Sequence, residues 1–120
     1  CYSVGEHTIA ALCNIAPDRV LRLTMLLHDI AKPACKTVDE KGTCHYYGHP
    51  KKGVEMAKVF FGRLKFDGAT RDMVCRLIEW HDDNPPLEEK AIRRAIHKIG
   101  TQCYPALFQV KRADILAQSE

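Results

Sequence analysis

Apolar residues recur at helical spacing along nearly the whole of this 120-residue chain. Positions i, i+3, i+4 and i+7 are apolar in one segment after another, which is the pattern of helices with one buried face. The segment from Arg19 to about Ile30 is apolar almost all round, as is typical of a central, buried helix. This pattern predicts an all-α fold, a compact bundle of about six helices.

Turn and cap signals divide the pattern into elements. Pro17 and Asp18 end a first helix, whose predicted apolar stripe consists of Ile9, Leu12, Cys13 and Ala16. The run Asp39-Glu40-Lys41-Gly42 interrupts the helical pattern, so a short β-hairpin or an ordered loop is expected near residues 34–47.

The later helices also have recognisable ends. One begins near Gly48, since Pro50 is tolerated in a first helical turn. The next begins near Asp67, whose side chain can cap it. Another stops at Gly100, and the last runs from about Tyr104 to the end of the chain.

The composition limits the class of protein. With 46% hydrophobic and 28% charged residues, the chain matches an ordinary globular domain, and a single domain over residues 1–120 is expected. No apolar run of about 18 residues is present, so neither a membrane span nor a membrane partner is expected. A net charge of +3 does not by itself mark a nucleic-acid-binding protein. Because the first residue is Cys1 and not Met, we expect a piece of a longer protein.

The six cysteines form no CxxC pair. Because Cys13 and Cys75 also fall within helical, apolar periodicity, we expect reduced, partly buried thiols for the six cysteines, with disulfides as the alternative. Thiols that stay reduced favour a cytoplasmic location.

Ionisable residues occupy positions that the helical periodicity assigns to the core. They are His81 in the fourth helix, Asp114 in the last helix, and His28 and Asp29 at the end of the most hydrophobic one. A buried carboxylate is costly unless it is paired or bound to a cation, and several such residues together indicate a functional site. Histidine and carboxylate ligands without thiolate favour Mn, Fe, Co, Ni or Zn over Mg or Ca. We therefore expect a metal bound between facing helices.

The sequence around these residues resembles a known family. His7, the dyad His28-Asp29 and Asp114 reproduce the H…HD…D signature of the HD-domain metal-dependent phosphohydrolases. The run from Leu26 to Pro33 is similar to the LLHDIGKP run of that superfamily. The segment around Gly48-His49-Pro50 resembles the HD domain of bacterial tRNA nucleotidyltransferases, the CCA-adding enzymes.

The resemblance implies metal ligands and a reaction. The first divalent ion would be held by His7, His28, Asp29 and Asp114, and a second ion would add His49 and His81, with Asp29 as the bridge. The resemblance implies one or two ions, of Mn, Fe, Ni, Co, Zn or Mg, which would activate water for attack on phosphorus. Asp29 and Lys32 would be the catalytic residues, with Lys32 stabilising charge on the phosphate. A solvated lysine that favours the helix dipole is the alternative for Lys32.

The expected substrate is a phosphoester of a nucleotide, a cyclic phosphate or an RNA end, with tRNA as a partner of the parent protein. Its binding residues would be Lys32, Lys52 and His45. A wider basic rim could comprise Lys51, Lys52, Arg93, Arg94 and Lys98, although solvated helix faces are the alternative and the preferred explanation for the last three. The chain lacks the Gly-Ser loop and Asp-x-Asp pair of nucleotidyl transfer, so it is not expected to add nucleotides by itself.

Two other interpretations stay open. In the first, the domain is a non-catalytic helical module that positions tRNA for a separate nucleotidyltransferase head. Alternatively, zinc would bind to Cys35, Cys44, His45 and His49, although their spacing fits no common zinc finger. The sequence does not specify an oligomeric state.

Overall fold

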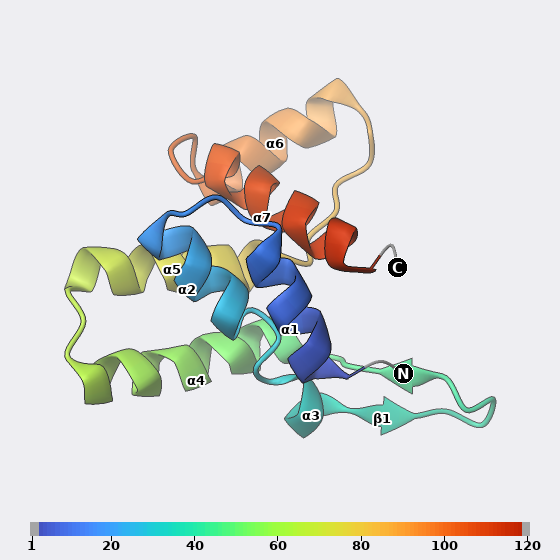
Figure 1. Ribbon diagram of the computed structural model, residues 1–120. Helices are drawn as coiled ribbons and strands as arrows, with labels where there is room; N and C mark the ends of the chain where they lie inside the picture. Colours follow the sequence, from blue (N-terminus) through green and yellow to red (C-terminus); the bar gives the residue numbers. More distant parts are fainter. Residues whose placement is uncertain (1–2, 119–120) are drawn as a thin grey trace.

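Seven helices and one small hairpin make up the computed structural model, which describes residues 3–118 (Figure 1). The helices are α1 (Val4–Cys13), α2 (Arg19–Leu27), α3 (Lys32–Cys35), α4 (His49–Leu64), α5 (Gly68–Trp80), α6 (Glu89–Ile99) and α7 (Tyr104–Gln118). Strands β1 (Thr37–Val38) and β2 (Cys44–His45) pair in antiparallel register. The all-α fold with a short hairpin is confirmed, and the single turn α3 is an addition to it. None of these helices combines the length and the apolar character that crossing a bilayer requires.

The predicted cap signals act where they were expected. The Asp67 side chain accepts a hydrogen bond from the backbone N–H of Thr70 at 2.9 Å and so caps α5. Gly100 ends α6 with φ 107°, a conformation that L residues rarely adopt. Helix α4 begins directly after Gly48, whose φ is 75°, and Pro50 lies in its first turn.

Helices α2 and α5 lie at the centre, between two apolar clusters. One cluster forms where α2 and α5 meet α1, α6 and α7, and its largest buried members include Met25, Leu77, Ile99 and Leu107. The other forms where they meet α4, and it includes Leu27, Phe61 and Ile78. The predicted central position of α2 is confirmed, but Leu26 is 46% exposed, so one face of α2 meets solvent.

The predicted apolar stripe of the first helix is wrong. Ile9 is 64% exposed and Cys13 is also exposed, whereas the buried residues of α1 are His7 and Ala11. The helix ends at Cys13, before Ala16, and Asn14 caps it by donating its backbone N–H to the carbonyl of Ala11. The apolar residues did not reveal the buried face of α1, because one of the two buried residues on that face is the polar His7.

The cysteines differ from the expectation at two positions. Cys13, Cys35, Cys75 and Cys103 are free, but Cys13 is exposed instead of partly buried. Cys44 is disulfide-bonded, so not every cysteine of the described residues is a reduced thiol. Cys1 lies outside the described residues.

Helices α4 and α5 approach each other closely at Gly53. A Cβ atom at this position would lie 3.2 Å from Cγ2 of Ile78 and 4.0 Å from the carbonyl oxygen of His28. Gly53 therefore holds α4 near the turn that carries His28 and Asp29.

We predict that Gly53→Val lowers the free energy of unfolding by about 1–3 kcal/mol, because the larger side chain overpacks the contact with Ile78. Gly62→Val in the same helix is the matched control, since nothing lies within 4 Å of a Cβ there. Urea unfolding of both variants measures the difference. Equal stabilities would contradict the close approach at Gly53.

Candidate metal centre

Six ionisable side chains from distant parts of the chain converge near the centre of the bundle. They are His7 from α1, His28 and Asp29 from the turn after α2, His49 at the start of α4, His81 directly after α5, and Asp114 from α7. The first five are buried, and the Asp114 side chain is 19% exposed. The structure therefore brings together all the residues that the resemblance implies as ligands.

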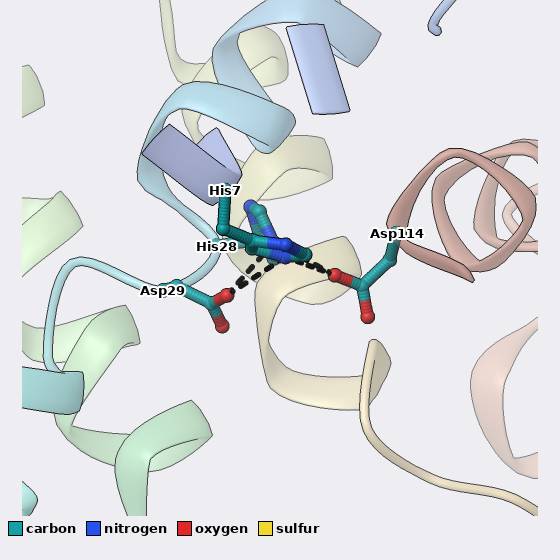
Figure 2. Close-up of side chains that lie close together, drawn as sticks. All are labelled: His7, His28, Asp29 and Asp114. Atoms are coloured by element: carbon teal, nitrogen blue, oxygen red, sulfur yellow. Dashed lines mark hydrogen bonds and ion pairs between the residues drawn. The ribbon is translucent and has the colours of Figure 1, made fainter. Parts of the chain in front are cut away.

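The first group contains His7, His28, Asp29 and Asp114 (Figure 2). Nε2 of His7 lies 2.6 Å from Oδ1 of Asp114 and 3.3 Å from Oδ2 of Asp29. Nε2 of His28 lies 3.2 Å and 3.1 Å from the same two oxygens. Each of the four residues thus offers a ligand atom within 4.8 Å of the other three.

The second group contains His49, His81 and again Asp29. Oδ1 of Asp29 lies 3.4 Å from Nε2 of His49 and 3.5 Å from Nε2 of His81. The two oxygens of Asp29 therefore face different groups, as a bridging carboxylate requires.

Backbone carbonyls orient three of the histidines in the same way. Nδ1 of His28 lies 2.6 Å from the carbonyl oxygen of Met25, and Nδ1 of His81 lies 2.6 Å from that of Ile78. Nδ1 of His49 lies 3.0 Å from the carbonyl oxygen of Tyr46. A carbonyl only accepts, so Nδ1 carries a proton, and in each neutral ring Nε2 presents a lone pair towards Asp29. This is the arrangement of a metal-ligating histidine.

The buried atoms of the centre fit a cation. Nε2 of His49 lies 3.2 Å from Nε2 of His81, and two lone pairs at that distance repel each other unless a positive charge lies between them. Oδ2 of Asp29 is buried and has no partner in hydrogen-bonding geometry within the described residues. Nε2 of His28 is 3.1 Å away, and Nε2 of His7 and Nζ of Lys32 are each 3.3 Å away. A divalent ion would satisfy both the nitrogens and this oxygen.

The charges of the centre also favour a cation. Burial by itself raises the pKa of Asp29, but contacts with His28, His49 and His81 hold that pKa far below its usual value. Burial by itself lowers the pKa of His28, but contacts with Asp114 and Asp29 outweigh it and raise the pKa to about 9. A proton on His28 and a metal ion would therefore compete for the same Nε2 lone pair.

Lys32 lies beside the centre and is mostly buried. Its Nζ is 3.3 Å from Oδ2 of Asp29, and its side chain is 12% exposed. The same Nζ lies 5.2 Å from the centroid of the Tyr46 ring, within the range of a cation–π contact. A solvated lysine at a helix end does not describe this position.

The other predicted binding residues lie outside the two groups. His45 contacts Asp39 at 2.9 Å, and Lys52 lies 3.6 Å from Glu55 with half of its side chain exposed. A continuous basic rim is wrong, because α6, which carries Arg93, lies on the opposite side of the bundle from α4 (Figure 1).

The zinc interpretation is not supported. Cys44 is disulfide-bonded, and His49 lies with Asp29 and His81. Neither group of potential ligands in residues 3–118 includes a cysteine.

Sequence reasoning missed Tyr46, which contacts both Lys32 and His49. Its ring faces Lys32, and its carbonyl accepts a hydrogen bond from Nδ1 of His49. The available signal was spacing, since Tyr46 precedes His49 by the same three residues that separate Met25 from His28.

Comparisons with known proteins agree with this geometry. The HD domain family profile matches residues 4–118. A CC-adding tRNA nucleotidyltransferase of Thermus thermophilus is 33% identical over 118 residues, which cover 93% of this chain and 27% of that protein. An A-adding tRNA nucleotidyltransferase of Deinococcus radiodurans is 30% identical over 117 residues, covering 92% and 27%. The chain spans about a quarter of the length of these curated relatives. Because the profile match extends over nearly all of the described residues, this chain belongs to the HD domain family.

Proposed function

We propose that this chain is a metal-dependent phosphohydrolase domain that hydrolyses a phosphoester of a nucleotide, a cyclic phosphate or an RNA end. HD domains are associated with metal-dependent phosphohydrolases and are found in tRNA nucleotidyltransferases. The observation that carries the proposal is the convergence of four histidines and two aspartates, with three Nδ1–H groups held by carbonyls. A purely structural cluster does not need its Nε2 lone pairs directed at a shared carboxylate.

The ligand residues would hold one or two divalent ions, with Asp29 as the bridge. A bound ion supplies Lewis-acid activation of water and neutralises charge on the phosphate oxygens. The chain contributes rigid orientation, because the carbonyls of Met25, Tyr46 and Ile78 fix the three imidazole rings before any ligand binds. Asp29 and Asp114 stay ionised there and attract the cation.

Lys32 would hold positive charge beside the reacting phosphate. Its ammonium group already lies 3.3 Å from Asp29. Nζ would donate a hydrogen bond to an anionic oxygen of the substrate when the Asp29 carboxylate holds a cation in its place. Lys52 and His45, on the flanking segments, are the further candidates for substrate contact.

We place this domain within a tRNA nucleotidyltransferase-like protein of the cytoplasm. Its relatives are named for adding C or A residues to tRNA, and the chain matches about a quarter of their length. The alternative is a helical module that only positions tRNA. Such a module would stay folded without any metal at the centre.

We predict that Asp29→Asn abolishes metal binding and lowers phosphoester hydrolysis by at least about 10³-fold, because the amide cannot bridge two cations. Elemental analysis and a panel of nucleoside monophosphates, 2′,3′-cyclic phosphates and small phosphomonoesters measure the loss. Asp72→Asn is the control, since Asp72 is exposed and contacts only Arg71 among the ion pairs described. Full turnover by Asp29→Asn would refute the proposal.

Metal addition should stabilise the protein. After treatment with a chelator, Mn²⁺, Co²⁺ or Ni²⁺ is expected to raise the free energy of unfolding by about 2.7 kcal/mol when the free ion is at 100 times its Kd. The same titration of Asp29→Asn should produce no stabilisation. If no divalent ion changes the free energy of unfolding of the wild type, the tRNA-positioning module is favoured instead.

Lys32→Ala should separate catalysis from metal binding. We expect metal affinity to be equal or tighter, because a positive charge beside Asp29 is removed, while kcat falls by about 10²–10³-fold. Metal titration and steady-state kinetics measure the two effects. Lys36→Ala, an exposed lysine at the end of α3, is the control and should change neither quantity. An unchanged kcat for Lys32→Ala would reduce Lys32 to a structural partner of Asp29.

A further inference from the structure

Tyr47 is an exposed aromatic residue next to the metal centre. It lies between β2 and α4, and its side chain is 73% exposed. A single exposed apolar side chain is common and carries no meaning by itself. Tyr47 differs from such residues because other side chains hold its ring in place.

The ring of Tyr47 stacks on that of His45. The centroids are 5.1 Å apart and the planes differ by 10°. Nε2 of His45 donates a hydrogen bond of 2.9 Å to Oδ2 of Asp39. Oδ1 of Asp39 in turn accepts bonds of 2.9 Å from the backbone N–H groups of Lys41 and Thr43. The hairpin turn thus fixes His45, which stacks on Tyr47 while most of the surface of Tyr47 stays exposed.

Tyr47 directly follows the residue that orients the centre. The carbonyl of Tyr46 contacts Nδ1 of His49, and the ring of Tyr46 contacts Lys32. Tyr47 and His49 are two positions apart in the chain, so their Cα atoms are at most about 7 Å apart. A phosphoester bound at the centre would therefore place its attached group near Tyr47.

A flat, rigid aromatic face beside a site for phosphate suits one kind of ligand. Nucleobases stack on aromatic side chains whatever their identity, because every base has a π-face. Cationic side chains for the phosphate are available in the neighbouring elements, from Lys32 in α3 and Lys52 in the first turn of α4. A phosphoester without a ring would leave the face of Tyr47 unused.

We propose that Tyr47, braced by His45, is the stacking platform for the nucleobase of the phosphoester substrate. This inference rests on the proposed hydrolysis of a nucleotide or RNA phosphoester. It gives His45 the role of a positioning residue that acts through Tyr47.

Paired ligands that differ only in the base test the platform. Nuclear magnetic resonance titrations would compare AMP with ribose 5-phosphate, and adenosine with ribose, for the wild type and for Tyr47→Ala. We expect Tyr47→Ala to weaken the binding of AMP and adenosine by about 5- to 150-fold. The ratio of AMP affinity to ribose 5-phosphate affinity should fall by the same factor. These measurements need neither a metal nor turnover.

Further variants separate stacking from a structural role. Tyr47→Trp should bind AMP as tightly as the wild type or more tightly, and Tyr47→Leu should resemble Tyr47→Ala. His45→Ala should weaken AMP by a smaller factor, since the ring remains but loses its brace. Phe108→Ala removes an aromatic side chain that is 66% exposed on α7, and it should leave AMP binding unchanged.

The outcomes distinguish this inference from the proposed function. Wild-type AMP affinity in Tyr47→Ala, or a wild type that binds AMP no better than ribose 5-phosphate, would overturn the platform even if hydrolysis depends on Asp29. Adenosine binding that depends on Tyr47 would support the platform even if no phosphoester of the panel is hydrolysed. Equal losses in Tyr47→Ala and Tyr47→Trp would also overturn it, because a structural role would then explain them.

Discussion

The buried carboxylate of Asp29 depends on partners that come from most elements of the fold. Its side chain is 1% exposed, and moving an ionised carboxylate out of water costs several kcal/mol unless it is well partnered. Its two oxygens face nitrogen atoms of four histidines and of Lys32, which come from α1, α3, α4 and the turns after α2 and α5. No single element can supply these partners, so Asp29 is compensated only when the bundle has assembled. Any ion bound there stabilises the whole arrangement of helices.

The helix ends contribute to this compensation through their carbonyl groups. The last carbonyls of an α-helix have no partner within the helix. His28 follows α2 and bonds to the carbonyl of Met25, and His81 follows α5 and bonds to that of Ile78. One hydrogen bond therefore satisfies a helix terminus and also fixes the tautomer of a candidate ligand. Because α2 and α5 are the two central helices, the ligand positions follow from the packing of the core.

Much of the fold could be predicted from the sequence because its signals are local. Asp67 and Gly100 mark helix ends through their own side chain or backbone freedom, and both act as predicted. The face of α1 could not be predicted from apolar residues, because its inward side is defined by His7, a buried polar residue. Hydrophobic periodicity fails where a functional side chain replaces an apolar one. The same replacement at His81 was recognised, because three apolar neighbours marked that face.

The members of the candidate site could be predicted, but their orientation could not. Periodicity and residue type marked His28, Asp29, His81 and Asp114 and indicated a cation, because a buried carboxylate needs a partner. His7 and His49 were identified only through the resemblance to the HD-domain family. Orientation depends on carbonyl groups, which every residue carries and which leave no pattern in the sequence. The spacing of three residues between Tyr46 and His49 becomes informative only once His28 and His81 show the same relation in the folded chain. The backbone thus determines which histidines can act as ligands, and the sequence determines only where histidines are available.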